Sequence, residues 1–331
     1  MKNRFLAYIG KRLIQAAATF IGIITIVFFV MHLIPADPIQ MQSGGAMAKN
    51  LDRSVVESVR KLYGLDKPLH IQYAMWLKQF FTFDFGRSIH DDRPVIVKIG
   101  EALPVTLALN ILSIIAALII AIPIGVLNAM RDNGIFDRVS NIILLVLYAL
   151  PTPLVALSLI SIASIQLNIF PLTGLVSDDY ALLSFPEQLL DMFWHLTLPL
   201  ICYTYGSLAF ITRLIRASML DTLSRDFIKT AYAKGLSERA VMLRHALRNS
   251  IMPVVTIFST LLPSLIGGSV IVEKIFSIPG MGYLMFESIR MFDYPVIMTV
   301  LSFSAFLTLI NILIVDISYV FINPRVSFEN T

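Results

Sequence analysis

The chain has 331 residues, of which 56% are hydrophobic and 15% are charged, and its formal net charge is +4. An ordinary soluble domain carries about 25% charged residues, so this composition excludes that class and indicates a membrane protein. The single cysteine, Cys202, excludes an intrachain disulfide and a cysteine metal centre. No basic groove interleaved with aromatic residues is visible, so the positive charge indicates membrane topology and no nucleic-acid partner.

Six apolar runs are each long enough to cross a lipid bilayer, which needs about 20 residues of helix. They predict an all-α polytopic membrane protein with six transmembrane helices. The first run could be a secretory signal, but it is longer than a signal core and no small-residue cleavage motif follows it, so we expect an uncleaved anchor. The predicted spans cover residues 12–34, 103–129, 139–167, 196–215, 250–272 and 296–322.

Lysine and arginine set the orientation of these spans. The tail 1–11 and the connection 217–249 are rich in both residues, so we expect both segments in the cytoplasm, and six spans then place both termini there. Residues 35–98 are also basic, but loops of this length are translocated largely regardless of charge. We expect these residues to form an external helical cap. Residues 99–331 should form the membrane-embedded core of the protein, which contains spans two to six.

Two amphipathic patterns support a helical cap. Residues 54–65 form the first pattern, and PLHIQYAMWLKQFF at residues 68–81 forms the second. The second pattern places five large side chains on one helical face: Leu69, Tyr73, Trp76, Leu77 and Phe80.

The motifs of several activity classes are missing. The chain has no G-x-x-x-x-G-K-S/T phosphate loop, no H-E-x-x-H and no G-x-S-x-G, so we expect neither an ATP site nor a catalytic site of its own. Its histidines lie at spacings unlike those of metal ligands, and we expect no metal and no cofactor. An ion-driven secondary transporter stays an alternative, although neither an inverted repeat nor a series of intramembrane carboxylates is visible. A polytopic membrane enzyme is the other alternative.

The connection before the fifth span contains two short helical patterns in KTAYAKGLSERAVMLRHALRNSIMP, residues 229–253. Asp226 can cap the first helix with its side chain, and Gly235 can supply the left-handed residue that ends it. Ser237 can cap the second helix, which leads into the fifth span. The second helix should bury one face: Val241, Leu243, Leu247 and Ile251.

Small side chains distinguish the first of these helices. Thr230, Ala231 and Ala233 would let the backbone of another protein approach closely, while Lys229 and Lys234 would set its orientation. We therefore expect a docking element for a partner protein. The alternative is a solvated loop whose charges only fix topology, but this does not account for the paired caps or for the glycine between the helices.

The same stretch resembles a family signature. With Gly235 aligned, KTAYAKG and the following HALR resemble the E-A-A-x-x-x-G-x9-I-x-L-P signature of permease subunits of ATP-binding-cassette importers, with departures at Lys229, Thr230, His245 and Arg248. The departures are similar to the dipeptide, oligopeptide and nickel branch, whose B-type subunit reads T-A-x-A-K-G-L and R-H-A-L-R-N-x-x-x-P. Further segments resemble that subunit in order: RLIQ, IPADP, LYGLDKPLHIQY, FDFGRS, LPVTLALN, YALPTP, HLTLPL, IFSIPGMG and NPRV.

The resemblance implies the six-span type I importer permease fold in a bacterial inner membrane. It implies three kinds of protein partner beside the lipid bilayer. These are a second homologous permease that completes a heterodimer, two cytoplasmic ATP-binding subunits that hydrolyse ATP, and an extracytoplasmic substrate-binding protein. The binding protein would meet the cap and the IPGMG segment. The cargo would be di- or oligopeptides, with nickel or another metal chelate as the alternative within the family.

The resemblance also assigns roles along the coupling loop 217–249. Small residues would permit close docking to the ATPase, basic residues would supply polar contacts, and Arg248 would fix how the loop joins the membrane. The expected coupling residues are Lys229, Thr230, Ala231, Ala233, Lys234, Gly235, Leu236, Ser237, Arg239 and Arg248.

Prolines and glycines in the fifth span loosen helical hydrogen bonding and permit bends. We expect this span to flex and to line the transport path, with close helix packing by small residues as the alternative. The residues concerned are Pro253, Pro263, Gly267 and Gly268.

Overall fold

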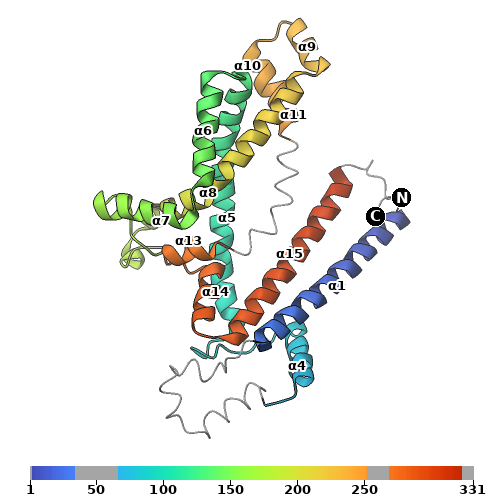
Figure 1. Ribbon diagram of the computed structural model, residues 1–331, viewed down its shortest axis with the longest axis vertical. Helices are drawn as coiled ribbons and strands as arrows, with labels where there is room; N and C mark the ends of the chain where they lie inside the picture. The colour runs from blue at the N-terminus through green and yellow to red at the C-terminus, as the bar shows by residue number, and fades with distance from the viewer. Residues whose placement is uncertain (1, 34–65, 252–267, 323–331) are drawn as a thin grey trace. The chain divides into compact units, whose positions relative to one another are not determined.

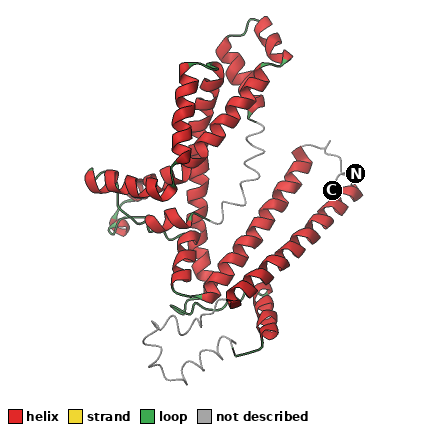
Figure 2. Cartoon of the chain, in the orientation of Figure 1, coloured by secondary structure: helices red, strands yellow, loops and turns green. Residues whose placement is uncertain are grey.

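The computed structural model describes residues 2–33, 66–251 and 268–322. Every regular element in these ranges is a helix, and no strand occurs among them (Figure 2). The all-α fold class is therefore confirmed. The chain divides into two compact units, Met1–Pro104 with Gly280–Thr331 as the first and Val105–Pro279 as the second.

The helices are labelled in Figure 1. Two π-helical segments, Ile160–Gln166 and Val241–Ala246, and a short 3-10 helix, Tyr180–Leu182, complete the set. The α-helices are α1 (Lys2–Leu33), α4 (Leu69–Phe81), α5 (Val95–Met130), α6 (Ile135–Ala149), α7 (Thr152–Leu159), α8 (Phe185–Leu223), α9 (Asp226–Ala233), α10 (Glu238–Ala240), α11 (Leu247–Ser250), α13 (Val270–Ile275), α14 (Met281–Arg290) and α15 (Tyr294–Ile322).

Four helices are long and apolar enough to cross a membrane: α1, α5, α8 and α15. They coincide with the first, second, fourth and sixth predicted spans. The helix α8 has 39 residues, which at about 1.5 Å per residue is roughly twice the thickness of a hydrocarbon core. It begins at Phe185 and not near residue 196, so the connection that precedes it is shorter than the sequence predicts.

The third predicted span, residues 139–167, is not a single straight helix. It is divided between α6 and the pair formed by α7 and Ile160–Gln166, and the two parts are bent by 96°. Leu150 is extended, with φ −74° and ψ 128°, because a following proline disfavours the helical conformation. The Tyr205 hydroxyl of α8 donates to the Leu150 carbonyl at 2.9 Å, so the break in the helix has a hydrogen-bond partner inside the protein.

Most of the fifth predicted span, residues 250–272, lies outside the described residues. Its last part differs from the prediction, because Gly268 has a φ of +61° and a new helix, α13, begins at Val270. The predicted first helix of the cap, at residues 54–65, also lies outside the described residues.

In the first unit, α1 and α15 lie side by side (Figure 1). The helix α4 covers part of α1 with Trp76 and Phe80, both buried, and the ring centroids of Phe20 and Phe80 are 5.0 Å apart. This confirms most of the apolar face predicted for α4, but Leu69 is 51% exposed. The buried side chains of α1 recur every three or four residues, as helical packing requires: Phe20, Ile24, Phe28 and Met31.

A buried carboxylate joins two distant parts of the first unit. Asp293, which immediately precedes α15, is 1% exposed. It accepts hydrogen bonds from the Ser88 hydroxyl at 2.5 Å and from the Ile89 N–H at 3.2 Å. Lys98 Nζ donates to Ser88 Oγ at 3.2 Å and lies 4.0 Å from an Asp293 carboxylate oxygen. We call Ser88, Ile89, Lys98 and Asp293 the carboxylate latch.

Asp91 pairs with the same lysine, with 2.9 Å between Lys98 Nζ and the carboxylate. Partial burial opposes ionisation of Asp91, but hydrogen bonds with Lys98 and Ser88 outweigh it and lower its pKa from 3.8 to about 2. A lowered carboxylate pKa stabilises the folded state at pH values above the unfolded pKa, and this stabilisation is lost as the pH falls toward 2. The Asp91 carboxylate beside the latch is therefore ionised at neutral pH.

Replacing Asp293 by alanine leaves the Ser88 hydroxyl and the Ile89 N–H without their acceptor, and each unsatisfied buried group costs about 1–3 kcal/mol. We expect Asp293→Ala to lower the apparent unfolding temperature in detergent and to speed tryptic cleavage after the exposed Arg87. Asp84→Ala is the matched control, because Asp84 is exposed and the one described hydrogen bond of its side chain, from the Gly86 N–H, is long at 3.4 Å. Equal effects of the two substitutions would show that the latch contributes nothing specific.

Candidate functional site

The predicted coupling residues lie on a short helical hairpin of the second unit. It contains α9, the turn at residues 234–237, and a second helical stretch formed by α10, Val241–Ala246 and α11. We call residues 226–250 the hairpin. It was predicted as two helices separated by a glycine, and the structure has this arrangement.

Gly235 ends α9 through a Schellman motif. Its φ is +77°, the left-handed region that glycine adopts without steric cost. The Gly235 N–H donates to the Tyr232 carbonyl at 2.9 Å, and the Leu236 N–H donates to the Ala231 carbonyl at 3.4 Å. These two bonds satisfy carbonyl groups that the end of a helix leaves free. The role predicted for Gly235 in ending the helix is thus confirmed.

The predicted side-chain caps are absent. Asp226 is the first residue of α9 and not its cap, and Arg225 at the cap position makes no side-chain capping bond. The Asp226 carboxylate instead pairs with Lys229 at 2.8 Å, and both side chains are largely exposed. Ser237 occupies the cap position of α10, but its hydroxyl makes no capping bond there.

One face of α9 is buried within the chain. Ile228 is 2% exposed and Ala231 is 5% exposed. Both belong to a cluster with Val241, Met242 and Ala246 of the second helical stretch. Ala231 therefore packs against its own chain, and the docking role predicted for it stays a prediction. Its small size lets the two arms of the hairpin pack closely.

The opposite face of α9 is exposed and carries short or polar side chains. At about 100° per residue, Asp226, Lys229 and Ala233 fall on the side facing away from the buried residues, and Thr230 adjoins them. All four are exposed. The Thr230 hydroxyl donates back to the Asp226 carbonyl at 3.0 Å, so it is engaged inside the helix.

Two aromatic residues flank this face. The Phe227 side chain is 45% exposed and the Tyr232 side chain is 44% exposed. Aromatic side chains carry much of the binding energy at protein interfaces. The sequence reasoning concentrated on the small residues and missed Phe227. The signal was available in the sequence, because Phe227 is a large aromatic residue on a short helix. The buried residues of this helix are Ile228 and Ala231.

The remaining predicted residues are spread along the exposed turn and the second arm. Leu243, predicted on the buried face, is 49% exposed, while Val241 of the same face is buried. The π-helical turn at Val241–Ala246 shifts the register of the face, because it inserts an extra residue into the helical period. The exposed predicted residues are Lys234, Leu236, Ser237, Arg239 and Arg248.

The hairpin shares its buried cluster with the long helices of the second unit. Met219 and Ile215 of α8 and Ala121 of α5 belong to the cluster that holds Ile228 and Ala231. The second arm is also fixed to α8, since the buried Ser250 hydroxyl lies 2.9 Å from the Thr222 hydroxyl. The hairpin and α8 therefore share one packed core and a buried hydrogen bond.

The helices α5 and α8 are themselves in close contact. A Cβ placed on Gly125 would lie 2.8 Å from the Ile215 Cβ and 2.9 Å from the Thr212 carbonyl. Only glycine allows this approach, so the two backbones meet here without an intervening side chain.

An ion pair connects α8 to the start of α6. Arg216 donates from Nε and from a terminal nitrogen to the two carboxylate oxygens of Asp137, each at 2.8 Å. Asp132, in the turn before α6, lies 2.5 Å from the same guanidinium. Asp137 is 3% exposed and also accepts from the Asn133 N–H at 3.1 Å. The two parallel hydrogen bonds of such a pair fix the relative orientation of the two side chains in addition to pairing their charges.

The structure places a second buried acid far from the hairpin in the sequence. Glu273 of α13 is fully buried and accepts from the Thr106 hydroxyl at 2.9 Å and from the Tyr203 hydroxyl at 3.0 Å. The Tyr203 oxygen in turn accepts from the Ser269 N–H at 2.8 Å. The sequence reasoning missed Glu273, although a lone carboxylate directly after an apolar run was visible in VIVEKIF.

Gly268 packs against this acid. A Cβ on Gly268 would overlap the Glu273 carboxylate and would lie 3.0 Å from the Thr106 methyl carbon. Gly268 therefore lies in a close-packed position. Close packing is the alternative to the flexing role predicted for this residue. The other predicted flexing residues, Pro253, Pro263 and Gly267, lie outside the described residues.

Among the residues that the structure describes, no group of three His, Cys, Asp or Glu side chains is placed to hold a metal ion. The class that the fold and the hairpin define is a polytopic membrane protein with a helical element outside its spans.

Comparison with known families identifies this class more closely. The chain belongs to the family of binding-protein-dependent transport system inner membrane components, whose model matches residues 121–328. The N-terminal model of the same transport-system membrane component matches residues 5–110. The resemblance found in the sequence is thereby confirmed.

Individual relatives cover almost the whole chain. The oligopeptide transport system permease protein AppB of Bacillus subtilis is 38% identical over 323 residues, which is 97% of this chain and 99% of the relative. The dipeptide transport system permease protein DppB of the same organism is 35% identical, over 97% of this chain and 98% of the relative. The glutathione transport system permease protein GsiC of Salmonella typhi is 35% identical, over 98% of this chain and 100% of the relative.

The role of Gly235 can be tested by a pair of glycine substitutions with opposite expected signs. Nothing lies within 4 Å of a Cβ at either Gly235 or Gly206, but only Gly235 has a positive φ. We expect Gly235→Ala to destabilise the protein by about 1–2 kcal/mol, the cost of a left-handed residue that carries a side chain. Gly206→Ala, inside α8, should stabilise it by about 0.5–1 kcal/mol. Thermal unfolding of both variants in the same detergent measures the difference, and a neutral Gly235→Ala would contradict the left-handed conformation of Gly235.

Proposed function

We propose that this chain is the transmembrane permease subunit of an ATP-driven importer of peptides. Membership of the binding-protein-dependent transport family carries the proposal, and three relatives named for oligopeptide, dipeptide and glutathione transport support peptides as cargo. A nickel or metal-chelate importer of the same family is the second candidate, suggested by the resemblance of residues 229–253 to that branch.

The hairpin is the element that would dock an ATP-binding subunit in the cytoplasm. Its exposed face on α9 is narrow and carries small or polar side chains, so it can enter a groove of a partner protein. Phe227 and Tyr232 on the two edges can then anchor it. Lys234, Arg239 and Arg248 supply charges for orientation, which affects the rate and specificity of association more than its affinity.

The buried cluster is what would transmit motion from the docked hairpin. When ATP closes the two ATPase subunits, they would carry α9 with them. Ile228 and Ala231 are packed into the core formed with α8 and α5, and packed cores rearrange as units and do not deform continuously. The Arg216–Asp137 pair extends the connection to α6. The spans would thereby tilt between inward-open and outward-open states.

The remaining partners and the orientation complete the proposal. A second, homologous permease would enclose the transport path together with this chain. The residues around the carboxylate latch and α14 would face a substrate-binding protein outside the cell. Both termini and the hairpin would then lie in the cytoplasm, as the distribution of lysine and arginine favours.

Transport by the reconstituted complex tests the proposed activity. We expect proteoliposomes that contain this chain, its second permease and both ATPase subunits to take up labelled oligopeptide when ATP is available to the ATPase subunits and binding protein is supplied on the opposite side. No uptake should occur with an ion gradient alone. Uptake of nickel but of no peptide would favour the second candidate, and uptake without the ATPase subunits would contradict the proposal.

Docking by the hairpin is best tested at Ala233, because its side chain is exposed while Ala231 is buried. We expect Ala233→Trp to leave folding intact and to reduce substrate-stimulated ATP hydrolysis by at least tenfold, since the large ring would hold the partner backbone away. Ala217→Trp, at an exposed position of α8 outside the hairpin, is the matched control and should retain near wild-type stimulation. Normal stimulation in Ala233→Trp would remove the hairpin from the ATPase contact.

A further inference from the structure

The hairpin holds most of the net positive charge of the chain. Residues 226–250 include five lysines and arginines and two acids, a net charge of +3, while the formal net charge of the whole chain is +4. One of the two acids, Asp226, is paired with Lys229 at 2.8 Å. The other is Glu238. Membrane topology alone accounts for the sign of this charge, so its arrangement has to show whether it serves a partner.

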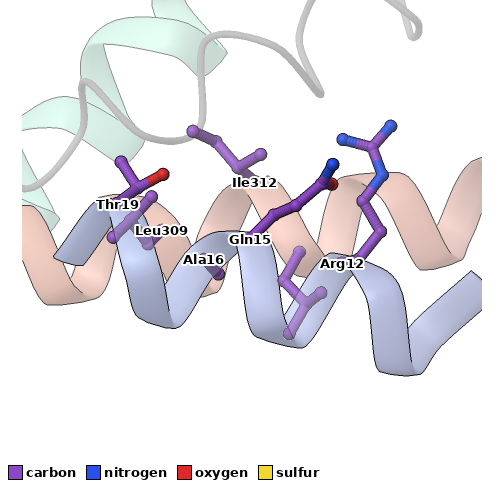
Figure 3. Close-up of a pocket in the computed structure, with 7 residues that line it drawn as sticks. Arg12, Gln15, Ala16, Thr19, Leu309 and Ile312 are labelled. Atoms are coloured by element: carbon purple, nitrogen blue, oxygen red, sulfur yellow. The ribbon is translucent and has the colours of Figure 1, made fainter. Parts of the chain in front are cut away.

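The arginines of the second arm are available for a partner. Arg239, Arg244 and Arg248 are all exposed. None of their side chains makes a hydrogen bond or an ion pair with the part of the chain that the structure describes. Each guanidinium can therefore offer its five N–H donors. By contrast, Arg12, which lines a groove between α1 and α15 (Figure 3), already has an interaction within the chain.

Packing turns two of these arginines to one side of the arm. Met242, Ala246 and Ser250 are buried at intervals of four residues. Arg244 and Arg248 each follow a buried residue by two positions, roughly half a turn of helix, so they lie on the side away from the core. Their own spacing of four residues makes them neighbours on the helix surface, where like charges repel each other. We call Arg244 and Arg248 the arginine pair.

The arm lies outside the bilayer in the orientation proposed above. The Ser250 hydroxyl donates to the Ser218 carbonyl at 3.1 Å and lies 2.9 Å from the Thr222 hydroxyl. These two residues of α8 are about 5–10 Å beyond the predicted end of the fourth span at residue 215. A headgroup layer is about 5–8 Å thick. Arg244 is about 9 Å further along the arm than Ser250, and Figure 1 shows α10 beyond α11. This position favours a protein partner over lipid headgroups.

We propose that the arginine pair binds an acidic surface of the ATP-binding subunit, with a carboxylate of that subunit on each guanidinium. The inference rests on the proposed function, because it names the chemistry of the partner that the hairpin docks. Arginine suits this contact, since its planar fork can donate two parallel hydrogen bonds to one carboxylate. Carboxylates at these positions would also remove the repulsion between the two arginines.

The surface between α9 and the second arm is continuous. Every residue from Tyr232 to Arg239 is exposed. A subunit that receives the exposed face of α9 can therefore extend along the turn to the arginine pair. Arg244 was not among the residues predicted for coupling, so the structure adds it to the docking surface.

The contact is tested by the rate at which the ATP-binding subunits associate with the two permeases in nanodiscs of phosphatidylcholine. Exposed charges steer association, so we expect the double variant Arg244→Gln with Arg248→Gln to associate about tenfold more slowly at low ionic strength, with little change in the dissociation rate. The difference should disappear near about 0.5 M salt, where screening shortens the reach of charges to a few ångströms.

Arg138→Gln is the matched control. Arg138 is exposed and has no ion pair within the described chain, but it lies on α6 and outside the hairpin. This variant should associate like the wild type. Equal slowing in Arg138→Gln and the double variant would reduce the effect to general attraction by positive charge and overturn the proposal. Wild-type association of the double variant would overturn it directly.

Two further arms separate charge from folding and protein from lipid. Arg244→Lys with Arg248→Lys keeps both charges and should recover most of the association rate, which a folding defect would not allow. The slowing by the glutamine variant should be the same in phosphatidylcholine and in nanodiscs that also contain phosphatidylglycerol. Slowing that occurs only with phosphatidylglycerol would assign the arginine pair to headgroups and overturn the proposal.

Photocrosslinking identifies the partner directly. Leu243 is 49% exposed and precedes Arg244, so a benzoylphenylalanine at position 243 samples the surroundings of the pair. Crosslinks to the ATP-binding subunit support the proposal, and crosslinks to lipid or to the second permease instead would overturn it. If Ala233→Trp abolishes stimulation while the glutamine variant associates normally, this inference fails and the proposed docking stands. Normal stimulation in Ala233→Trp together with normal association would remove both.

Discussion

The hairpin of this permease depends on a core that it shares with the long helices of the second unit. Ile228 and Ala231 of α9 are buried with residues of α5, α6, α8 and the second arm of the hairpin in a single cluster. A helix of eight residues has little stability of its own, so α9 is held in place by this packing. The same packing joins the hairpin to the long helices of the second unit. The coupling element that we propose is therefore built into the core of the unit that it would move.

Buried acids hold the remaining connections, and each is matched by donors. Asp293 accepts from Ser88 and Ile89, while Glu273 accepts from Thr106 and Tyr203. A buried carboxylate without such donors would cost several kcal/mol, on the order of the free energy of folding itself. Because every acid is satisfied from another segment, each one specifies which parts of the chain meet. These contacts give directional specificity to helices whose apolar surfaces alone would allow many arrangements.

The exposed surface of α1 illustrates the opposite situation, where packing within the chain stops. Apolar side chains of α1 such as Ile14 and Ile26 are exposed in the chain, as expected for a helix that faces lipid or another subunit. In a bilayer such surfaces carry no penalty. Shape and polar groups therefore decide which lipids or helices occupy them.

The sequence by itself determined the class of the protein and the local elements. Composition and apolar runs identified an all-α membrane protein, the Gly235 signal identified the end of α9, and the ordered motifs identified the family, because these properties depend on residues close together in the chain. The break at Pro151 was also local, since proline restricts the residue before it, yet the apolar pattern continued through it and concealed it.

Only the tertiary structure decided which side chains face inward. Ala231 and Ala233 carry the same side chain two positions apart. Ala231 is buried in the core, whereas Ala233 is exposed. Leu243 is exposed because a π-helical turn shifts the helical register, which periodicity assumes to be constant. Glu273 and Asp293 gained their donors from residues far away in the sequence. Burial and hydrogen bonding depend on contacts between distant segments, so no local pattern could determine them.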